Sequence, residues 1–332
     1  MQLVMDRWYA ILSSAELRAG APLAARRLGQ DVVAWRDAAG RVALAVDRCP
    51  HRQVRLSPGR VVEGQLECPF HGFRFAGDGA CAHMPAIPGR APSGAMALAT
   101  LPAREEHGLI WAWTGSGPPP AGPVPFFDFT GMAWSGSEFI EPVACHYTRA
   151  IENQLDFPHL PFVHHNSIGR SLRHEMDVAT EVEGDRIRGY LRDQDASFLE
   201  LHAPNVWRLR LGPTWGFLVM APVDEGRMVY YSRSYQPFVT RGPLAWLIGL
   251  VNRVSNRFIL RQDSAVVETH PPGESRLRSG EVLIPADSPI VAFRRWREAR
   301  RGELNPWAAR WKARGGGDAG SGAADGPAEA GA

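Results

Sequence analysis

The chain has 332 residues, 45% of them hydrophobic, and its 37 Lys and Arg residues nearly balance 35 Asp and Glu residues. This length and composition predict two domains with ordinary packed cores, and a net charge of +2 is too small to indicate binding to nucleic acid or to a membrane surface. The first residues lack a secretory signal pattern, and the longest apolar run, near Leu244–Val251, is too short to span a membrane. We therefore expect a cytoplasmic protein with no membrane span.

Short strands and turns are predicted for the first third of the chain, in keeping with its 34 glycines and 27 prolines overall. Ser13 and Glu16 have the spacing of a capping box at the start of one short helix. The segments Val32–Trp35 and Val42–Val46 flank a turn-forming run and predict a hairpin. Further strands are expected at Val61–Glu67 and Gly108–Trp113.

The most informative feature is a repeated pairing of one cysteine with one histidine, in Cys49-Pro50-His51 and Cys68-Pro69-Phe70-His71. Two cysteines on one iron and two histidines on the other are the ligand set of a Rieske [2Fe–2S] cluster. Zinc also accepts two cysteines and two histidines, but zinc motifs usually group like ligands together. Disulfides are disfavoured because no secretory signal is present and the other cysteines, Cys81 and Cys145, lie in unrelated contexts.

Together with Leu56-Ser57-Pro58-Gly59 and Gly72-Phe73, these segments resemble the Rieske domain of the Rieske non-haem iron oxygenases. The resemblance implies a cluster held by Cys49, His51, Cys68 and His71. Relatives usually carry a glycine and a proline within the segment that here reads Gln53-Val54-Arg55. This departure leaves the ligands untouched and alters an exposed loop that faces an electron donor.

A Gly- and Pro-rich run at 115–123 has the composition of a linker. We place the Rieske domain at 1–117, the linker at 118–125 and a second domain at 126–314. The Gly-, Ala- and Asp-rich tail at 315–332 is expected to be disordered because it has little to bury.

The second domain begins with a candidate mononuclear metal site at Asp156, His159 and His164. In a regular helix, five positions rotate by roughly 140° and rise by about 7.5 Å, so the two imidazoles would not face one ion. Pro161 can distort the turn and bring them together. His165 is the rival of His164.

Downstream of a Rieske domain, the pattern Asn153, Asp156, His159, His164 resembles the mononuclear iron motif of the same oxygenase family. The resemblance implies that His159 and His164 are iron ligands. It also implies that Asp156 is a carboxylate linking the iron to a Rieske histidine of the neighbouring subunit. Asn153 matches a residue near the iron.

Two histidines need a carboxylate to complete the facial triad of non-haem Fe(II) oxygenases, which leaves positions open for O2. In the family this ligand follows about one hundred residues later on a C-terminal helix, and Asp263 matches it, 99 residues after His164. Gln262 stands where relatives more often have an acidic residue, and Glu268 and Asp287 are the other candidates. Helical spacing of apolar residues precedes this position, at Leu247, Val251, Val254 and Phe258.

Alternating apolar and polar residues between the histidines and Asp263 indicate antiparallel strands, at Val206–Leu211, Phe217–Ala221 and Met228–Tyr235. The expected fold class is α+β, an all-β Rieske domain followed by a helix-grip catalytic domain in which a curved sheet wraps a long helix. Aromatic and apolar residues of these strands either line a substrate pocket or belong to the core: Trp207, Trp215, Phe217, Met220, Tyr230, Tyr231 and Tyr235.

The resemblance implies the catalytic subunit of a single-component, homotrimeric Rieske oxygenase of the demethylase or monooxygenase type. A separate NAD(P)H-dependent reductase or ferredoxin would supply electrons, and O2 would oxidise a small organic substrate, aromatic or polycyclic. The cofactors would be a [2Fe–2S] cluster and a mononuclear Fe(II). Two alternatives remain: a Rieske electron carrier with an inactive second domain, and a zinc-stabilised binding protein.

Overall fold

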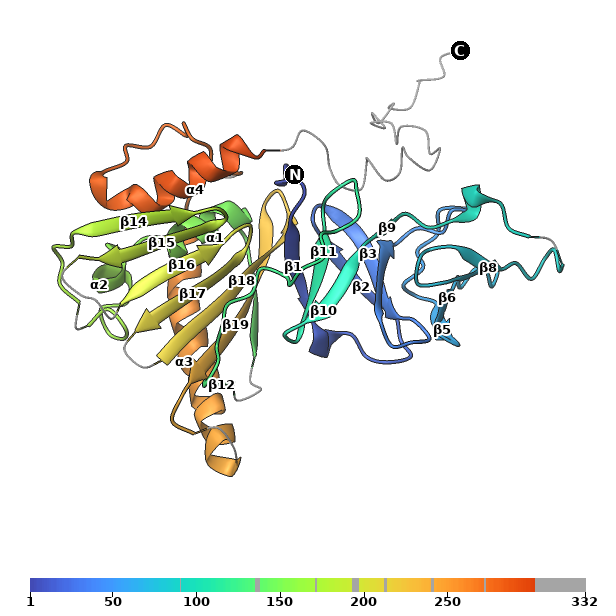
Figure 1. Cartoon of the computed structure of the whole chain (residues 1–332), viewed down its shortest axis with the longest axis horizontal. Coiled ribbons are helices and arrows are strands. Elements are labelled where there is room, and N and C mark those ends of the chain that lie inside the picture. The colour runs from blue at the N-terminus through green and yellow to red at the C-terminus, as the bar shows by residue number, and fades with distance from the viewer. Residues whose placement is uncertain are drawn as a thin grey trace, which may run out of the picture.

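The computed structural model describes residues 1–89, 91–134, 138–170, 172–192, 197–211, 214–239, 242–271 and 273–301. Its first part is all-β, apart from two short 3-10 turns, as predicted (Figure 1). Three small sheets form it: β1 (Trp8–Ser13), β11 (Leu109–Trp113) and β10 (Ala103–Glu106); β2 (Leu23–Arg27), β3 (Gln30–Arg36), β4 (Val42–Val46) and β9 (Thr100–Leu101); and β5 (Arg60–Val62), β6 (Gln65–Glu67), β7 (Arg74–Phe75) and β8 (Cys81–His83).

Local sequence signals explain several of these elements. The capping box is present, because the backbone N–H of Ser13 donates to Glu16 at the 3-10 turn Ser14–Glu16. The predicted hairpin is β3–β4. The predicted strand at 61–67 is wrong in one respect: it is a hairpin of β5 and β6, because Glu63 and Gly64 adopt φ values of 51° and 77° and reverse the chain.

The second part is built on one antiparallel sheet of eight strands. Seven follow the order β12-β19-β18-β17-β16-β15-β14, and β13 also pairs with β19. The strands are β12 (Ala133–Trp134), β13 (Phe139–Val143), β14 (Val178–Glu183), β15 (Arg186–Leu191), β16 (Phe198–His202), β17 (Val206–Leu211), β18 (Thr214–Asp224) and β19 (Arg227–Gln236). The helices are α1 (Tyr147–Gln154), α2 (Leu160–Val163), α3 (Gly242–Val267) and α4 (Ser288–Ala299).

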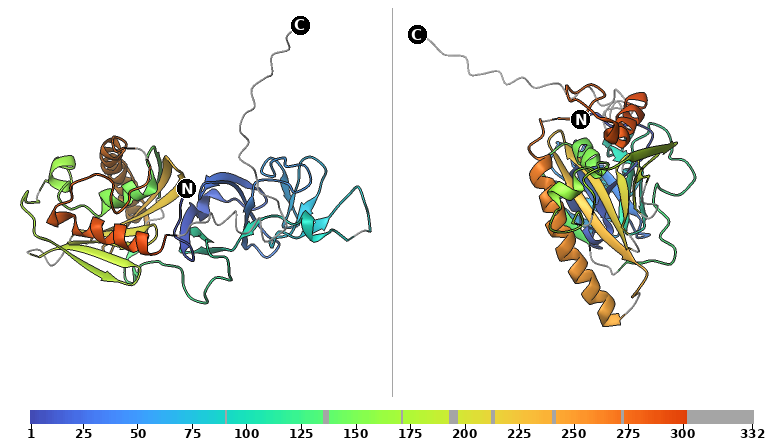
Figure 2. Two further views of the ribbon diagram at one scale, coloured as in Figure 1. Left: turned by 90° about the horizontal axis from the view of Figure 1, so that it is seen from above. Right: turned by 90° about the vertical axis from the view of Figure 1, so that its left-hand side faces the viewer.

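The long helix α3 runs along one face of this sheet, and its N-terminal end projects beyond the sheet (Figures 1 and 2). This arrangement confirms the predicted helix-grip domain. The apolar stripe that predicted the helix, however, faces outward: Leu247, Val254 and Phe258 are 48%, 63% and 54% exposed. None of the helices in the described ranges is long and apolar enough to cross a membrane.

The two parts of the chain pack against each other through β1 and the β2–β3 turn on one side and β18 on the other. The backbone N–H groups of Leu28 and Gly29 donate to the carbonyls of Pro222 and Val223. The buried Asn205 side chain accepts from the N–H of Ala10 and donates to its carbonyl. These contacts fix the position of one part relative to the other.

The segment proposed as a linker lies against the first part of the chain. The Arg104 guanidinium donates to the carbonyls of Pro120 and Gly122, and the Trp113 indole N–H donates to that of Gly117. Val124 is buried. The tail predicted to be disordered, 315–332, lies outside the described residues.

Candidate metal centres and cavity

The two Cys-His segments form loops with the same backbone hydrogen bonds. In the first, the N–H of Cys49 donates to the carbonyl of Val54, and Gln53 N–H donates back to the Cys49 carbonyl. In the second, Cys68 donates to Phe73, and Gly72 donates back to Cys68. Each loop therefore needs a left-handed residue at its fifth position, where Gln53 has φ 57° and Gly72 has φ 70°.

Both loops present their side chains to one place. The His51 and His71 rings lie with their centroids 4.7 Å apart, and both cysteines are buried. Burial, and then the adjacent Cys68 thiol, raise the pKa of Cys49 to about 12. Hydrogen bonds from the backbone N–H groups of His51 and Arg52 lower this pKa, but they do not offset the effect of burial. Such thiols become thiolates when a cation compensates the charge, so the two-thiol, two-imidazole set fits a [2Fe–2S] cluster.

The second candidate centre lies around α2. His159 immediately precedes this four-residue helix and His164 immediately follows it, so one helical turn separates them. Pro161 lies in the first turn of α2, where a backbone N–H has no helical partner and its absence is tolerated. The proline therefore belongs to the start of a short helix and does not kink a longer one. The two rings consequently approach to a centroid distance of 5.3 Å, which a regular helix would not allow.

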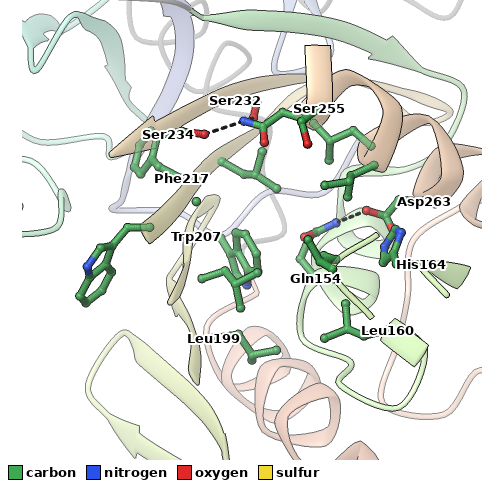
Figure 3. Close-up of a pocket in the computed structure, with 18 of the residues that line it drawn as sticks. Gln154, Leu160, His164, Leu199, Trp207, Phe217, Ser232, Ser234, Ser255 and Asp263 are labelled. Carbon is green, nitrogen blue, oxygen red and sulfur yellow. Dashed lines mark hydrogen bonds and ion pairs between the residues drawn. The ribbon is translucent and has the colours of Figure 1, made fainter. Parts of the chain in front are cut away.

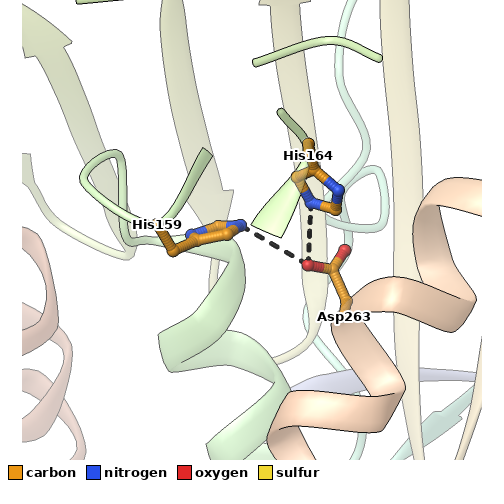
Figure 4. A group of neighbouring side chains, drawn as sticks. All are labelled: His159, His164 and Asp263. Atoms are coloured by element: carbon orange, nitrogen blue, oxygen red, sulfur yellow. Dashed lines mark hydrogen bonds and ion pairs between the residues drawn. The ribbon is translucent and has the colours of Figure 1, made fainter. Parts of the chain in front are cut away.

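Asp263 of α3 joins these histidines, although 99 residues separate it from His164 (Figure 4). Its Oδ1 lies 3.0 Å from His164 Nε2 and 3.4 Å from His159 Nε2. One ligand atom from each of the three residues lies within 4.8 Å of the others. Two imidazoles and one carboxylate in this arrangement fit the facial donor set of a non-haem Fe(II) centre.

The Asp263 carboxylate is held by the end of α1. Asn153 Nδ2 donates to its Oδ1 at 2.9 Å, and Gln154 Nε2 donates to its Oδ2 at 3.2 Å. Burial by itself would raise the pKa of this carboxyl, but hydrogen bonds to His159 and His164 hold it below its usual range. The sequence had singled out Asn153 but not Gln154, which carried no signal beyond its place beside Asn153.

Gln262, the residue before Asp263, contacts the other side of His164. Its Oε1 lies 3.0 Å from His164 Nδ1, while His164 itself is 1% exposed. An amide oxygen can only accept, so His164 Nδ1 carries a proton and donates it to Gln262; Nε2 faces Asp263 and His159 and is the nitrogen that would offer its lone pair to a bound metal ion. Relatives more often have an acidic residue at position 262. Gln262 therefore gives the candidate ligand His164 a neutral hydrogen-bond acceptor.

Asp156 lies in the turn between α1 and α2, and so it does not share a helical face with His159. Its Oδ2 is 3.9 Å from His159 Nδ1, longer than a hydrogen bond. Both His159 Nδ1 and Asp156 Oδ1 are buried and lack a hydrogen-bond partner among the described residues. Burial raises the pKa of Asp156, His159 opposes this effect and Asp287 adds to it.

The rival ligand candidates lie elsewhere. His165 is exposed, and its Nδ1 is 3.0 Å from the carbonyl of Phe162. Glu268 accepts from the backbone N–H of Ala144. Asp287 accepts from the N–H of Ile284 at the turn that leads into α4. The structure thus places Asp263, and neither Glu268 nor Asp287, beside the two histidines.

A cavity of about 240 Å³ opens beside the three residues, between the sheet and α3 (Figure 3). Of the seven side chains considered for a pocket, four line it, Trp207, Trp215, Phe217 and Tyr235, and the other three are buried in the core. Its remaining lining is Gln154, Asp156, His159, Leu160, His164, Ile168, Leu199, Leu209, Gly216, Leu218, Ser232, Ser234, Asn252, Ser255, Asn256, Ile259, Leu260 and Asp263.

The cavity and the two Cys-His loops lie far apart. In Figure 1, β5–β8 and their loops form one end of the molecule, and α2 with the adjoining half of α3 lies towards the other. The strands β1–β4 and β17–β19 lie between them (Figure 1).

Comparisons with known proteins give a match in each part of the chain. Residues 7–102 match the family model of the Rieske [2Fe-2S] domain, and residues 143–200 match that of the vanillate O-demethylase oxygenase C-terminal domain. The chain is 34% identical to the vanillate O-demethylase oxygenase subunit of a Pseudomonas species over 205 residues, which are 60% of this chain and 59% of that subunit. It is also 34% identical over 167 residues to the oxygenase component of dicamba O-demethylase from Stenotrophomonas maltophilia, covering 49% and 48% of the two chains.

Among solved structures, dicamba monooxygenase bound to 3,6-dichlorosalicylic acid superposes with a TM-score of 0.73 at 22% identity. The match covers 90% of this chain and 98% of that one, which shows the same fold. The sequence alignments are shorter, and the chain spans less than two thirds of the length of the curated relatives it matches.

Proposed function

Because this chain combines a Rieske [2Fe-2S] domain with an oxygenase C-terminal domain and is homologous to vanillate and dicamba O-demethylase oxygenase subunits, we propose that it is the oxygenase component of a Rieske non-haem iron system. It hydroxylates, demethylates or otherwise oxidises a small aromatic or polycyclic substrate. O2 is the oxidant, and NAD(P)H supplies electrons through a separate reductase or ferredoxin. A cytoplasmic location stays a prediction.

The observation that carries this proposal is the convergence of His159, His164 and Asp263 at the wall of a cavity whose lining is largely apolar. These residues would hold Fe(II), and Cys49, His51, Cys68 and His71 would hold the cluster. When bound, the cluster passes single electrons, and a facial-triad iron has open positions at which O2 reacts. Neighbouring residues of the chain orient these metal ligands. Asn153 and Gln154 hold the Asp263 carboxylate by hydrogen bonds, and Gln262 fixes the tautomer of His164.

Electron transfer in this proposal runs between neighbouring copies in a homotrimer. The two centres lie towards opposite ends of one chain (Figure 1), which favours transfer across an interface over transfer within the chain. A head-to-tail ring brings the cluster end of one copy to the iron end of the next. Asp156 is a suitable bridge because its side chain is 28% exposed while its Oδ2 lies 3.9 Å from Nδ1 of the candidate ligand His159.

The test of the catalytic site uses His159→Ala and His164→Ala. Each variant should lose substrate-dependent O2 consumption with a surrogate reductase, because the iron loses a ligand. Each should keep the visible and EPR spectra of the cluster, because the Cys-His loops are remote. Full activity in both variants would show that the triad is assigned to the wrong residues.

Complementation tests the inter-subunit route. A His71→Ala chain lacks a cluster ligand and keeps the iron site, whereas a His159→Ala chain has the converse defect. Each variant alone should be inactive. Co-expressed equally, about a quarter of the interfaces in a random head-to-tail ring join an intact cluster to an intact iron site, so about a quarter of the activity should return. Mixed assemblies without activity would contradict transfer between copies.

A further inference from the structure

The helix α3 places several polar residues on the side that lines the cavity, beside the apolar Ile259 and Leu260, and several apolar residues on the side that faces outward. Asn252, Ser255 and Asn256 line the cavity, whereas Leu247, Val254 and their neighbours are exposed. A helix that packs on a sheet usually directs its apolar side inward. Packing therefore does not account for amide and hydroxyl groups on the cavity side, and departures of this kind are expected where a ligand binds.

Asn256 is held in a defined position by the opposite wall. Its Nδ2 donates to Ser234 Oγ at 2.8 Å and to Ser232 Oγ at 3.3 Å, both on β19. Its Oδ1 has no hydrogen-bond partner among the residues that the structure describes. Because a serine hydroxyl either donates or accepts, the same pair also holds the flipped amide, which would leave the Nδ2 donors free. In either orientation Asn256 keeps one hydrogen-bonding group for a ligand.

This polar group is separate from the candidate iron ligands. Figure 3 shows Ser232, Ser234 and Ser255 along one side of the cavity, apart from His164 and Asp263. Along α3, Ile259 and Leu260 lie between Asn256 and Asp263 and line the cavity, and Leu199, Trp207 and Phe217 are among the apolar side chains on the rest of its wall. A bound molecule would thus meet iron ligands at one end, apolar walls along its length and neutral hydrogen-bonding groups at the other end.

The charge of the lining limits what the polar end can bind. Within the described ranges, the carboxyl and imidazole groups of the cavity wall are those of Asp156, His159, His164 and Asp263, all at the iron end; the phenol of Tyr235 is also in the wall, which includes neither Lys nor Arg. A carboxylate buried without a cationic partner is strongly penalised, whereas a neutral amide or hydroxyl needs one good hydrogen bond. The polar end therefore suits an uncharged group.

We infer that the cavity selects a neutral, largely apolar substrate whose amide, carbonyl or hydroxyl group hydrogen-bonds to Asn256, and that it rejects the corresponding carboxylate. This inference rests on the proposed function, because the group to be oxidised is the one that lies at the His159, His164 and Asp263 end. The polar end thereby sets both which molecules bind and which part of them faces the iron.

The experiment is titration calorimetry of the full chain with a panel of one- and two-ring methoxyaryl amides, each beside its carboxylate and its parent methoxyarene. The amides should bind at least about tenfold more tightly than the carboxylates. Asn256→Leu should weaken amide binding by about tenfold and leave the parent arenes unchanged, because it removes a hydrogen bond and keeps apolar contact. Val254→Asn is the matched control on the outer side of the helix and should change none of the three.

Carboxylates that bind as tightly as amides, no binding by any panel member, or unchanged amide affinity in a folded Asn256→Leu variant would each overturn the inference. If that variant does not fold, the double variant Ser232→Ala with Ser234→Ala should weaken amide binding instead, since it releases Asn256. Unchanged affinity there would overturn the inference as well. Amide binding without any O2-dependent product from the iron-loaded protein would support the cavity assignment and contradict the proposed function.

Discussion

Replacing Gln262 by leucine should weaken metal binding at the triad without changing the ligands themselves. Gln262 Oε1 lies 3.0 Å from His164 Nδ1, and His164 is 1% exposed, so water cannot readily replace the lost acceptor. A buried N–H left without a partner costs about 1–3 kcal/mol. Outer partners of metal-binding histidines typically change metal affinity by about 10- to 100-fold, and we expect a loss in that range.

The assay is anaerobic competition between the protein and a chelator for Fe(II), with Co(II) as a second probe. The visible spectrum of the cluster serves as the internal control, because the cluster loops lie far from α3 (Figure 1). Gln262→Glu is the matched variant. It keeps an acceptor, adds a charge that favours the protonated Nδ1, and should bind metal at least as tightly as the unaltered chain.

Equal metal affinity in Gln262→Leu and the unaltered chain would refute the role assigned to this glutamine. A loss in Gln262→Glu as large as that in Gln262→Leu would also count against it, because then the shape of the side chain and not its acceptor would matter.

Four further substitutions test other parts of the site. Asp156→Asn should keep both metals and normal cluster reduction while product formation collapses, and normal cluster reoxidation in single-turnover kinetics would contradict a bridging role. Asp263→Ala should lose the mononuclear iron by metal analysis and Glu268→Ala should keep it; the reverse result would move the ligand. Gly169→Ala should lower metal affinity and the melting temperature, because a Cβ would lie 1.9 Å from the carbonyl oxygen of Leu160 and displace α2; an unchanged melting temperature would show that α2 accommodates it.

Local patterns were sufficient where a few adjacent residues determine the backbone. The Ser13 and Glu16 capping box and the β3–β4 hairpin were predicted from local patterns, and the long helix that carries Asp263 from apolar spacing together with the family resemblance. The hairpin at Glu63 and Gly64 was missed because a left-handed glutamate has no strong sequence signal.

The candidate sites depended on a different kind of information. Spacing alone gave no reason for Asp263 to meet His164 across 99 residues, and that expectation came from resemblance to a family. The turn between α1 and α2 was not predicted either, because Pro161 was read as a distortion within a helix and not as the first turn of a new one. Contacts to the ligands, such as those of Gln154 and Gln262, depend on tertiary packing and have no sequence period.

The helix α3 shows why periodicity identified an element but not its orientation. Its apolar spacing was correct evidence for a helix, yet the fold directs Leu247 and Phe258 outward and Asn252 and Asn256 to the cavity. A hydrophobic period shows that one side of a helix is more apolar than the other, but it does not show which of the two sides faces the sheet. The direction of that difference follows from the sheet that the helix covers. The cavity side of α3 carries Asn252, Ser255 and Asn256 beside the apolar Ile259 and Leu260. Hydrogen-bonding groups at inner positions are expected where a ligand binds, so Asn256 is the residue of α3 that carries information about the substrate.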